Sequence, residues 1–92
     1  MLNLRNTNLD DDKAIAILKN IDRAVVTNID ISENPRLTSK FYTFLTELIC
    51  DIGTNLQWLE IERNPIDLQV LEQLLEALAA AKCVKMLNLS HC

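Results

Sequence analysis

The chain has 92 residues, of which 49% are hydrophobic, 4% aromatic and 24% charged, and its formal net charge is −4. This length accommodates one core, and the composition is too apolar for a disordered chain. The mild charge, spread over interspersed acidic and basic residues, argues against a broad basic face, so a general nucleic-acid-binding protein is not expected.

The first predicted elements are a short strand and a helix near the N-terminus. Leu2 and Leu4 alternate with polar residues, which predicts a strand with one buried face. Three aspartates follow at positions 10 to 12. They resemble a metal-binding cluster in isolation, but their place at a helix start makes capping the better explanation. We expect the helix over residues 11–21, with Asp10 as its N-cap.

The same order of elements recurs twice more along the chain. Apolar pairs at Ile29/Ile31 and Leu59/Ile61 predict two further strands. Thr38 and Asp67 are the expected N-caps of helices over residues 39–51 and 68–81. The second of these stretches is short for a membrane span and carries charged and amide side chains, so it is expected to be an amphipathic helix.

Four segments share one pattern, in which two apolar residues one apart are followed three positions later by Thr, Asn or Cys. Their first residues are 27, 30 and 28 positions apart. The segments are Leu2, Leu4, Thr7; Ile29, Ile31, Asn34; Leu59, Ile61, Asn64; and Leu87, Leu89, Cys92. We expect the side chains at the third position to bind backbone groups left unpaired where the chain turns away from the sheet.

Further apolar residues extend this pattern to the signature L-x-x-L-x-L-x-x-N/C-x-L. They are Val26, Leu56 and Val84 before the pairs, and Leu9, Leu37 (after one inserted residue) and Ile66 behind them. The sequence therefore resembles the leucine-rich repeat family, in its ribonuclease-inhibitor-like subclass with repeats of roughly 28 residues. The resemblance implies an α/β solenoid of about three repeats, with a curved parallel sheet on the concave side and helices on the convex side.

The repeats divide the chain approximately into residues 1–25, 26–55, 56–83 and a partial repeat at 84–92, all within one segment, 1–92. Terminal repeats of a solenoid normally carry a polar cap, and neither end of this sequence shows one. We therefore expect a fragment, a partial trace or a link in a longer array. A complete protein whose ends are covered by a partner is the alternative.

The predicted partner-binding surface is the concave face of the sheet, onto which the residues between the buried apolar positions point. The residues assigned to it are Trp58, Glu60, Glu62, Asp30, Met86, Asn88 and Arg5. Tryptophan is enriched at binding hot spots, and the carboxylates suggest a basic partner. The alternative is that Trp58 packs on a neighbouring side chain and the acidic residues are merely solvated.

No catalytic or metal site is expected. Cys83, His91 and Cys92 match no four-ligand spacing, and Cys50 has no evident base nearby. Three cysteines without a scaffold-like spacing suggest a reduced, intracellular protein, and no cleavable signal is evident. We expect a non-enzyme that has no cofactor, binds no small-molecule substrate, nucleic acid or membrane, and resides in the cytoplasm.

The resemblance leaves several functions open. The leading hypothesis is a protein-binding module or structural scaffold. Similar proteins include the ribonuclease inhibitor, tropomodulin-like actin regulators, innate immune receptors and axonemal subunits. A cytoskeletal or axonemal (ciliary) assembly is slightly favoured, from family breadth alone. The alternatives are a GTPase-activating protein of the Ran type and the substrate-recognition arm of a ubiquitin ligase.

Overall fold

The chain alternates strands with helices throughout. The computed structural model describes residues 2–22, 25–50, 55–81 and 86–90. The elements, in chain order, are β1 (Leu2–Asn3), α1 (Asp11–Lys19), β2 (Asn28–Asp30), α2 (Ser39–Cys50), β3 (Trp58–Glu60), α3 (Leu68–Ala81) and β4 (Met86–Asn88). The three predicted helices are confirmed, although α1 ends two residues before its predicted end.

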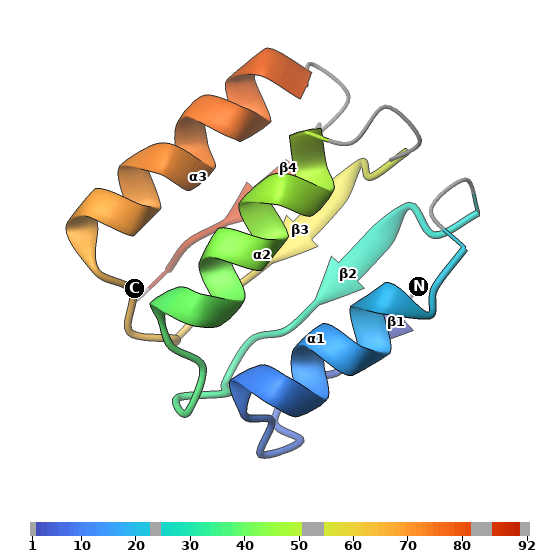
Figure 1. Cartoon of the computed structure of the whole chain (residues 1–92), viewed down its shortest axis with the longest axis vertical. Coiled ribbons are helices and arrows are strands. Elements are labelled where there is room, and N and C mark those ends of the chain that lie inside the picture. Colours follow the sequence, from blue (N-terminus) through green and yellow to red (C-terminus); the bar gives the residue numbers. More distant parts are fainter. Residues whose placement is uncertain (1, 23–24, 51–54, 82–85, 91–92) are drawn as a thin grey trace.

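The elements form two layers. The four strands make one parallel sheet in the order β1-β2-β3-β4, so every strand lies beside its neighbours in sequence. All three helices cover the same face of this sheet (Figure 1). No helix of the described residues lies on the opposite face, which we call the open face.

The register of the strands explains how the sheet meets the helices. Leu2 lies opposite Ile29, Ile29 opposite Leu59, and Leu59 opposite Leu87, so one apolar row crosses all four strands. Side chains alternate between the two faces of a strand, and this row faces the helices. The residues on either side of it in each strand therefore point to the open face.

Each helix begins at the N-cap that the sequence predicts. The Asp10 carboxylate accepts a hydrogen bond from the Lys13 N–H (2.9 Å), and the Asp67 carboxylate accepts one from the Gln69 N–H (2.9 Å). The Thr38 hydroxyl accepts a longer bond, 3.3 Å, from the Lys40 N–H. These side chains bind N–H groups that the first helical turn leaves without an internal partner.

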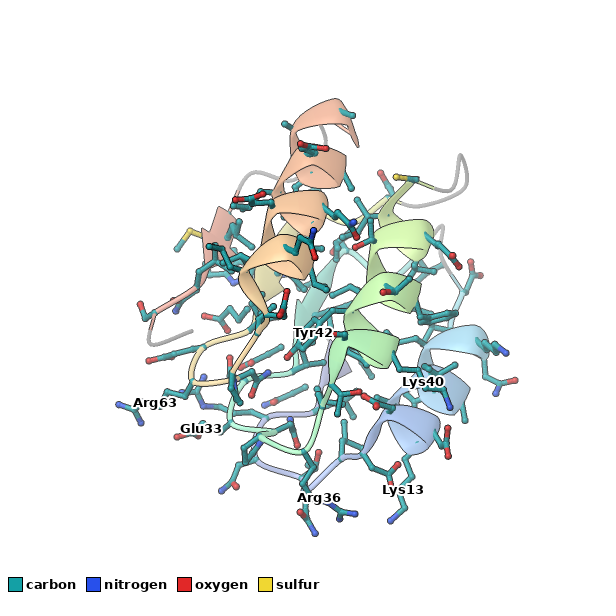
Figure 2. The ribbon with its side chains drawn as sticks, turned by 60° about the vertical axis from the view of Figure 1, so that its left-hand side comes forward. Lys13, Glu33, Arg36, Lys40, Tyr42 and Arg63 are labelled. Carbon is teal, nitrogen blue, oxygen red and sulfur yellow. The ribbon has the colours of Figure 1, made fainter. Side chains whose placement is uncertain are left out.

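One aliphatic core fills the space between the layers. Its central residues are Leu18, Ile29, Ile31, Phe41, Tyr42, Leu45, Leu56, Leu59, Ile61 and Leu74. Phe41 and Tyr42 are consecutive in α2 and pack edge to face, with ring centroids 5.2 Å apart. Tyr42 points from α2 into the interior (Figure 2). Because α2 contacts both α1 and α3, it is the central element of the helical layer.

The expectation of a leucine-rich-repeat solenoid of about three repeats is wrong. The molecule measures 28 × 25 × 20 Å, and its Cα radius of gyration is 11.7 Å. That radius is close to the value of about 12 Å typical of a compact domain of this length. Four strands and three helices around one core are too short to extend along a solenoid axis. The α/β class and the parallel sheet are confirmed. The concave and convex sides were expected only of a solenoid, so that expectation is given up with it.

Removing a central core side chain tests this packing. Leu59 is fully buried in an internal strand, so Leu59→Ala removes apolar contacts and leaves a cavity. We expect the free energy of unfolding to fall by about 2–5 kcal/mol, measured by urea denaturation followed by circular dichroism. Leu68→Ala is the matched control, because Leu68 is 69% exposed and its loss is expected to change stability by less than about 0.5 kcal/mol. Equal losses for the two variants would contradict this account of the core.

Candidate functional site

The open face is organised as rows of side chains that run across the strands. Register pairs place Asn28, Trp58 and Met86 in one row, and Asp30, Glu60 and Asn88 in the next. Beyond the strand ends the ladder continues, because the Glu33 N–H donates to the Glu62 carbonyl and the Arg63 N–H donates to the Ser90 carbonyl, both at 2.9 Å. Neighbouring side chains within a row are about 5 Å apart, and successive rows about 7 Å apart.

The first row carries the exposed apolar part of the face. Trp58 is 37% exposed and Met86 is 43% exposed, and the two residues are direct cross-strand neighbours. Both sites were predicted from the sequence, and the structure brings them together. Glu60 and Asn88, the next residues on the same strands and the same face, are half-buried.

Asp30, which the sequence assigns to the partner-binding face, is largely covered by its neighbours. This residue is only 5% exposed, and Ser32, two positions on, is fully buried. The Ser32 N–H donates to the Asp30 carboxylate (2.9 Å), and the Arg5 guanidinium lies 3.5 Å from the same carboxylate. Strand alternation places Asp30 on the open face correctly, but it does not show that Arg5 and Ser32 cover it.

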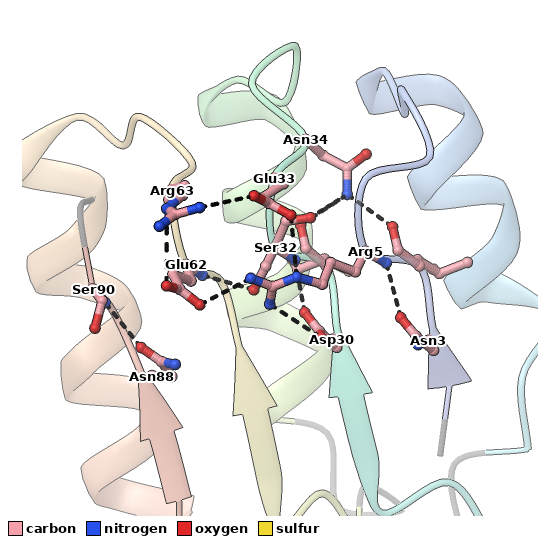
Figure 3. A network of polar contacts seen from close by, with 12 residues as sticks. Asn3, Arg5, Asp30, Ser32, Glu33, Asn34, Glu62, Arg63, Asn88 and Ser90 are labelled. Carbon is pink, nitrogen blue, oxygen red and sulfur yellow. Dashed lines mark hydrogen bonds and ion pairs between the residues drawn. The ribbon is translucent and has the colours of Figure 1, made fainter.

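Arg5 is the centre of an ionic network on the open face (Figure 3). Its guanidinium is 3.1 Å from Glu33 and 3.1 Å from Glu62, in addition to its contact with Asp30. Arg63 lies 3.1 Å from Glu33 and 3.9 Å from Glu62, which closes a four-membered ring of alternating charges. The network joins segments that follow β1, β2 and β3.

Arg5 and Asp30 are both held in their charged forms. The hydrogen bond to Glu62 raises the pKa of Arg5; partial desolvation lowers it, but the charges of Glu33 and Asp30 add to the increase. Burial raises the pKa of Asp30. Hydrogen bonds from the Ser32 backbone and hydroxyl, hydrogen bonding with Glu60 and the charge of Arg5 outweigh it, so the pKa lies below its ordinary value.

Glu33 and Arg63 are the site residues that sequence analysis missed. Both have left-handed backbone conformations, with φ of 57° and 61°, as does Asn6 with φ of 52°. Each of these residues directly precedes the Thr or Asn at the third position of the recurring pattern. The left-handed turn interrupts the two-residue alternation of a strand, so alternation cannot predict where these side chains point. Their recurrence one residue before the Asn was the available signal.

Asn34 fixes the turn that carries Glu33. Its side-chain oxygen accepts hydrogen bonds from the N–H groups of Thr7 (3.2 Å) and Leu9 (3.0 Å), in the loop between β1 and α1. Its side-chain nitrogen lies 2.9 Å from the carbonyl oxygens of both Leu4 and Ile31. The prediction that this residue binds backbone groups at the turn is confirmed.

Asn64 makes the same kind of hydrogen bonds at the turn that follows β3. Its side-chain oxygen accepts from the Asn34 N–H at 2.6 Å, and its side-chain nitrogen donates to the Ile31 carbonyl at 2.8 Å. Both asparagines are fully buried. The two amides therefore link consecutive turns at a fixed spacing. These turns carry Glu33 and Arg63 of the ionic network.

The acidic run at the N-terminus serves the packing of α1 and α2. Asp10 caps α1, Asp11 accepts hydrogen bonds from the backbone N–H and hydroxyl of Thr38, and Asp12 lies 2.8 Å from the Lys40 ammonium. The hydrogen bond and charge of Lys40 lower the pKa of Asp12. Each carboxylate thus has a structural partner, as the capping interpretation requires for Asp10.

The remaining candidates give no chemical centre in the described part of the chain. No group of three or more His, Cys, Asp and Glu side chains there could hold a metal ion. Cys50 is a free thiol exposed at the end of α2. Cys83, His91 and Cys92 lie outside the described residues. None of the helices, as far as the structure describes them, combines the length and the apolarity needed to cross a membrane.

Comparisons of the chain with protein-family models, with curated proteins and with solved structures find no match. The candidate site is therefore defined by the geometry of the open face itself: an exposed apolar pair beside a row of acidic and amide side chains, bordered by the ring around Arg5.

Asn34→Ala tests the buried amide. The change leaves several buried N–H and carbonyl groups without a partner, each costing about 1–3 kcal/mol, so we expect the free energy of unfolding to fall by about 3 kcal/mol or more. Asn55→Ala, at an exposed loop position, is the control and is expected to have little effect. Urea denaturation measures both. A loss below 1 kcal/mol for Asn34→Ala would show that the turns hold without the amide.

The lowered pKa of Asp30 leads us to expect a specific pH dependence of the free energy of unfolding. Because its pKa is lowered in the folded protein, its carboxylate contributes stability that is fully present well above its ordinary pKa of about 3.9. That contribution is lost as the pH falls through the lower, folded-state pKa. We expect wild type to lose more unfolding free energy than Asp30→Asn between about pH 5 and pH 2, measured by urea denaturation at each pH. Parallel curves for the two proteins would contradict this role.

Proposed function

We propose that this chain is a protein-binding module that holds its partner on the open face of the sheet. The observation that supports the proposal is the exposed pair Trp58 and Met86, placed side by side in a row of the open face. Aromatic residues and methionine are enriched at protein interfaces, and a tryptophan surrounded by polar groups is a common hot spot.

The construction of the face supports the same proposal. The strands, the asparagine-linked turns and the ring around Arg5 hold the surrounding side chains in place before any partner arrives. A surface that is already ordered loses little conformational entropy on binding. The opposite face of the sheet is covered by helices and cannot offer its apolar row to a partner.

The narrower assignments rest on the family resemblance alone. They are a scaffold in a cytoskeletal or axonemal assembly, a GTPase-activating protein of the Ran type, and the recognition arm of a ubiquitin ligase. No contact or cluster among the described residues favours one of them over the others. A cytoplasmic location is likewise only a proposal, and it comes from the cysteine pattern.

Substitution of the apolar pair tests the binding function. We expect Trp58→Ala together with Met86→Ala to weaken binding of a partner recovered by affinity capture by about tenfold or more, since a central hot-spot residue contributes 2 kcal/mol or more. Isothermal titration calorimetry with the purified partner measures the loss. Leu68→Ala is the control, because Leu68 is an exposed apolar residue in the helical layer.

Comparison with Leu68→Ala shows which face binds the partner. If Leu68→Ala weakens binding and the paired change does not, the helical layer is the working surface and the proposal is wrong. Circular dichroism of each variant shows whether the fold is retained.

A further inference from the structure

The open face has an unbalanced charge. Among the described residues, its charged side chains are Arg5, Asp30, Glu33, Glu60, Glu62 and Arg63, which comprise four carboxylates and two guanidinium groups. The face therefore has two negative charges more than its own cations neutralise. The excess is adjacent to the apolar pair, because Glu60 follows Trp58 by two residues on β3.

Glu60 is where the imbalance concentrates. It lies opposite Asp30 in the strand register, so two acidic side chains are cross-strand neighbours. Arg5 contacts Asp30 but directs its shorter contacts to Glu33 and Glu62. Within the described part of the chain, no basic side chain forms an ion pair with Glu60. Like charges directly opposite each other destabilise a sheet, and Arg5 relieves this cost at Asp30 but forms no ion pair with Glu60. A cation bound on Glu60 would reduce what remains of it.

Arg5 shows which chemistry this surface accepts. A single guanidinium lies within 3.5 Å of three carboxylates and stays one-third exposed. A planar guanidinium pairs with carboxylates through several N–H groups at once, which a compact ammonium cannot do. A second guanidinium placed over Glu60 would meet the same kind of acceptor, with the Trp58 ring about 7 Å away along the strand.

We propose that the open face recognises a partner segment that presents an arginine beside an apolar side chain, with the arginine on Glu60 and the apolar group on Trp58 and Met86. This inference rests on the proposed protein-binding function and adds the chemistry of the partner. The two rows are about 7 Å apart, which matches side chains two positions apart in an extended segment.

A peptide that alternates leucine and arginine at every second position, with glutamine between them and with blocked ends, is the probe. Its matched control has citrulline in place of each arginine, which keeps the shape and removes the charge. Trp58 is the only tryptophan of the chain, so its fluorescence reports contact with the open face. We expect saturable changes in Trp58 emission with the arginine peptide, and at least about fivefold weaker binding of the citrulline peptide.

Glu60→Gln separates this contact from general attraction between opposite charges. The glutamine amide retains a hydrogen-bonding group beside Asp30 and removes the carboxylate. We expect it to weaken arginine-peptide binding by about threefold or more. Glu72→Gln, an exposed charge on α3 in the helical layer, is expected to change binding by less than twofold. Raising the salt concentration is expected to weaken binding to wild type more than binding to Glu60→Gln.

Three outcomes would overturn the inference. Equal binding of both peptides, with a Trp58 response, would mean that the face binds apolar segments without reading charge, and the proposed function would stand. Equal weakening by Glu60→Gln and Glu72→Gln would mean that net charge alone attracts the peptide. If neither peptide alters Trp58 emission, the inference fails, and the proposed function is then decided by the separate Trp58/Met86 substitutions against the captured partner.

Discussion

The side-chain amide of Asn34 is the interaction on which the open face depends. It is fully buried. It accepts hydrogen bonds from backbone N–H groups of the loop after β1, and it donates to the carbonyls of Leu4 and Ile31. A buried turn without such a partner would leave several polar backbone groups unpaired, at a cost that a small domain cannot easily offset. Asn64 continues the connection by accepting from the Asn34 N–H. The segments that continue the ladder beyond the strand ends are therefore held in register.

The ionic network follows from this constraint. Glu33 and Arg63 directly precede the two asparagines, so the turns that the amides hold also set where these charges lie. Arg5 then bridges the two turns from the loop after β1. The side chains that restrain the end of the sheet border the row of Asp30, Glu60 and Asn88, which lies beside the exposed apolar pair. The stability of the turns and the shape of the candidate binding surface are therefore not independent properties.

Much of the local structure could be predicted from the sequence. The strand alternation and the capping residues depend on interactions between residues close in the chain, and Asp10 and Asp67 behave as predicted. The asparagines bond mainly to distant segments, but their recurrence after each strand predicts their role at the turns, and Asn34 behaves as predicted. The arrangement of the whole was not predictable in the same way. A recurring motif does not tell how far an array extends, and this chain closes around one core.

Only part of the candidate site could be predicted, because the rest depends on contacts between distant residues. The positions of Trp58 and Met86 follow from strand alternation, and their exposure agrees with it. The burial of Asp30 depends on Arg5, 25 residues away, and the ring also needs the left-handed backbone at Glu33 and Arg63. Neither long-range pairing nor a positive φ at a non-glycine residue is encoded in a period of two.

The left-handed turn at Glu33 has a consequence for protein engineering. A glutamate with φ of 57° is a position where a designer seeking thermostability would ordinarily substitute glycine, because glycine adopts this conformation without the steric cost of a Cβ. Here the substitution would delete the carboxylate that joins Arg5 to Arg63. Asparagine tolerates the left-handed region better than glutamate but carries no charge, so it would ease the backbone and still open the ring. Aspartate suits the backbone and keeps the charge, but its side chain is one methylene shorter. No residue that suits this backbone therefore keeps both the charge and the reach of the glutamate.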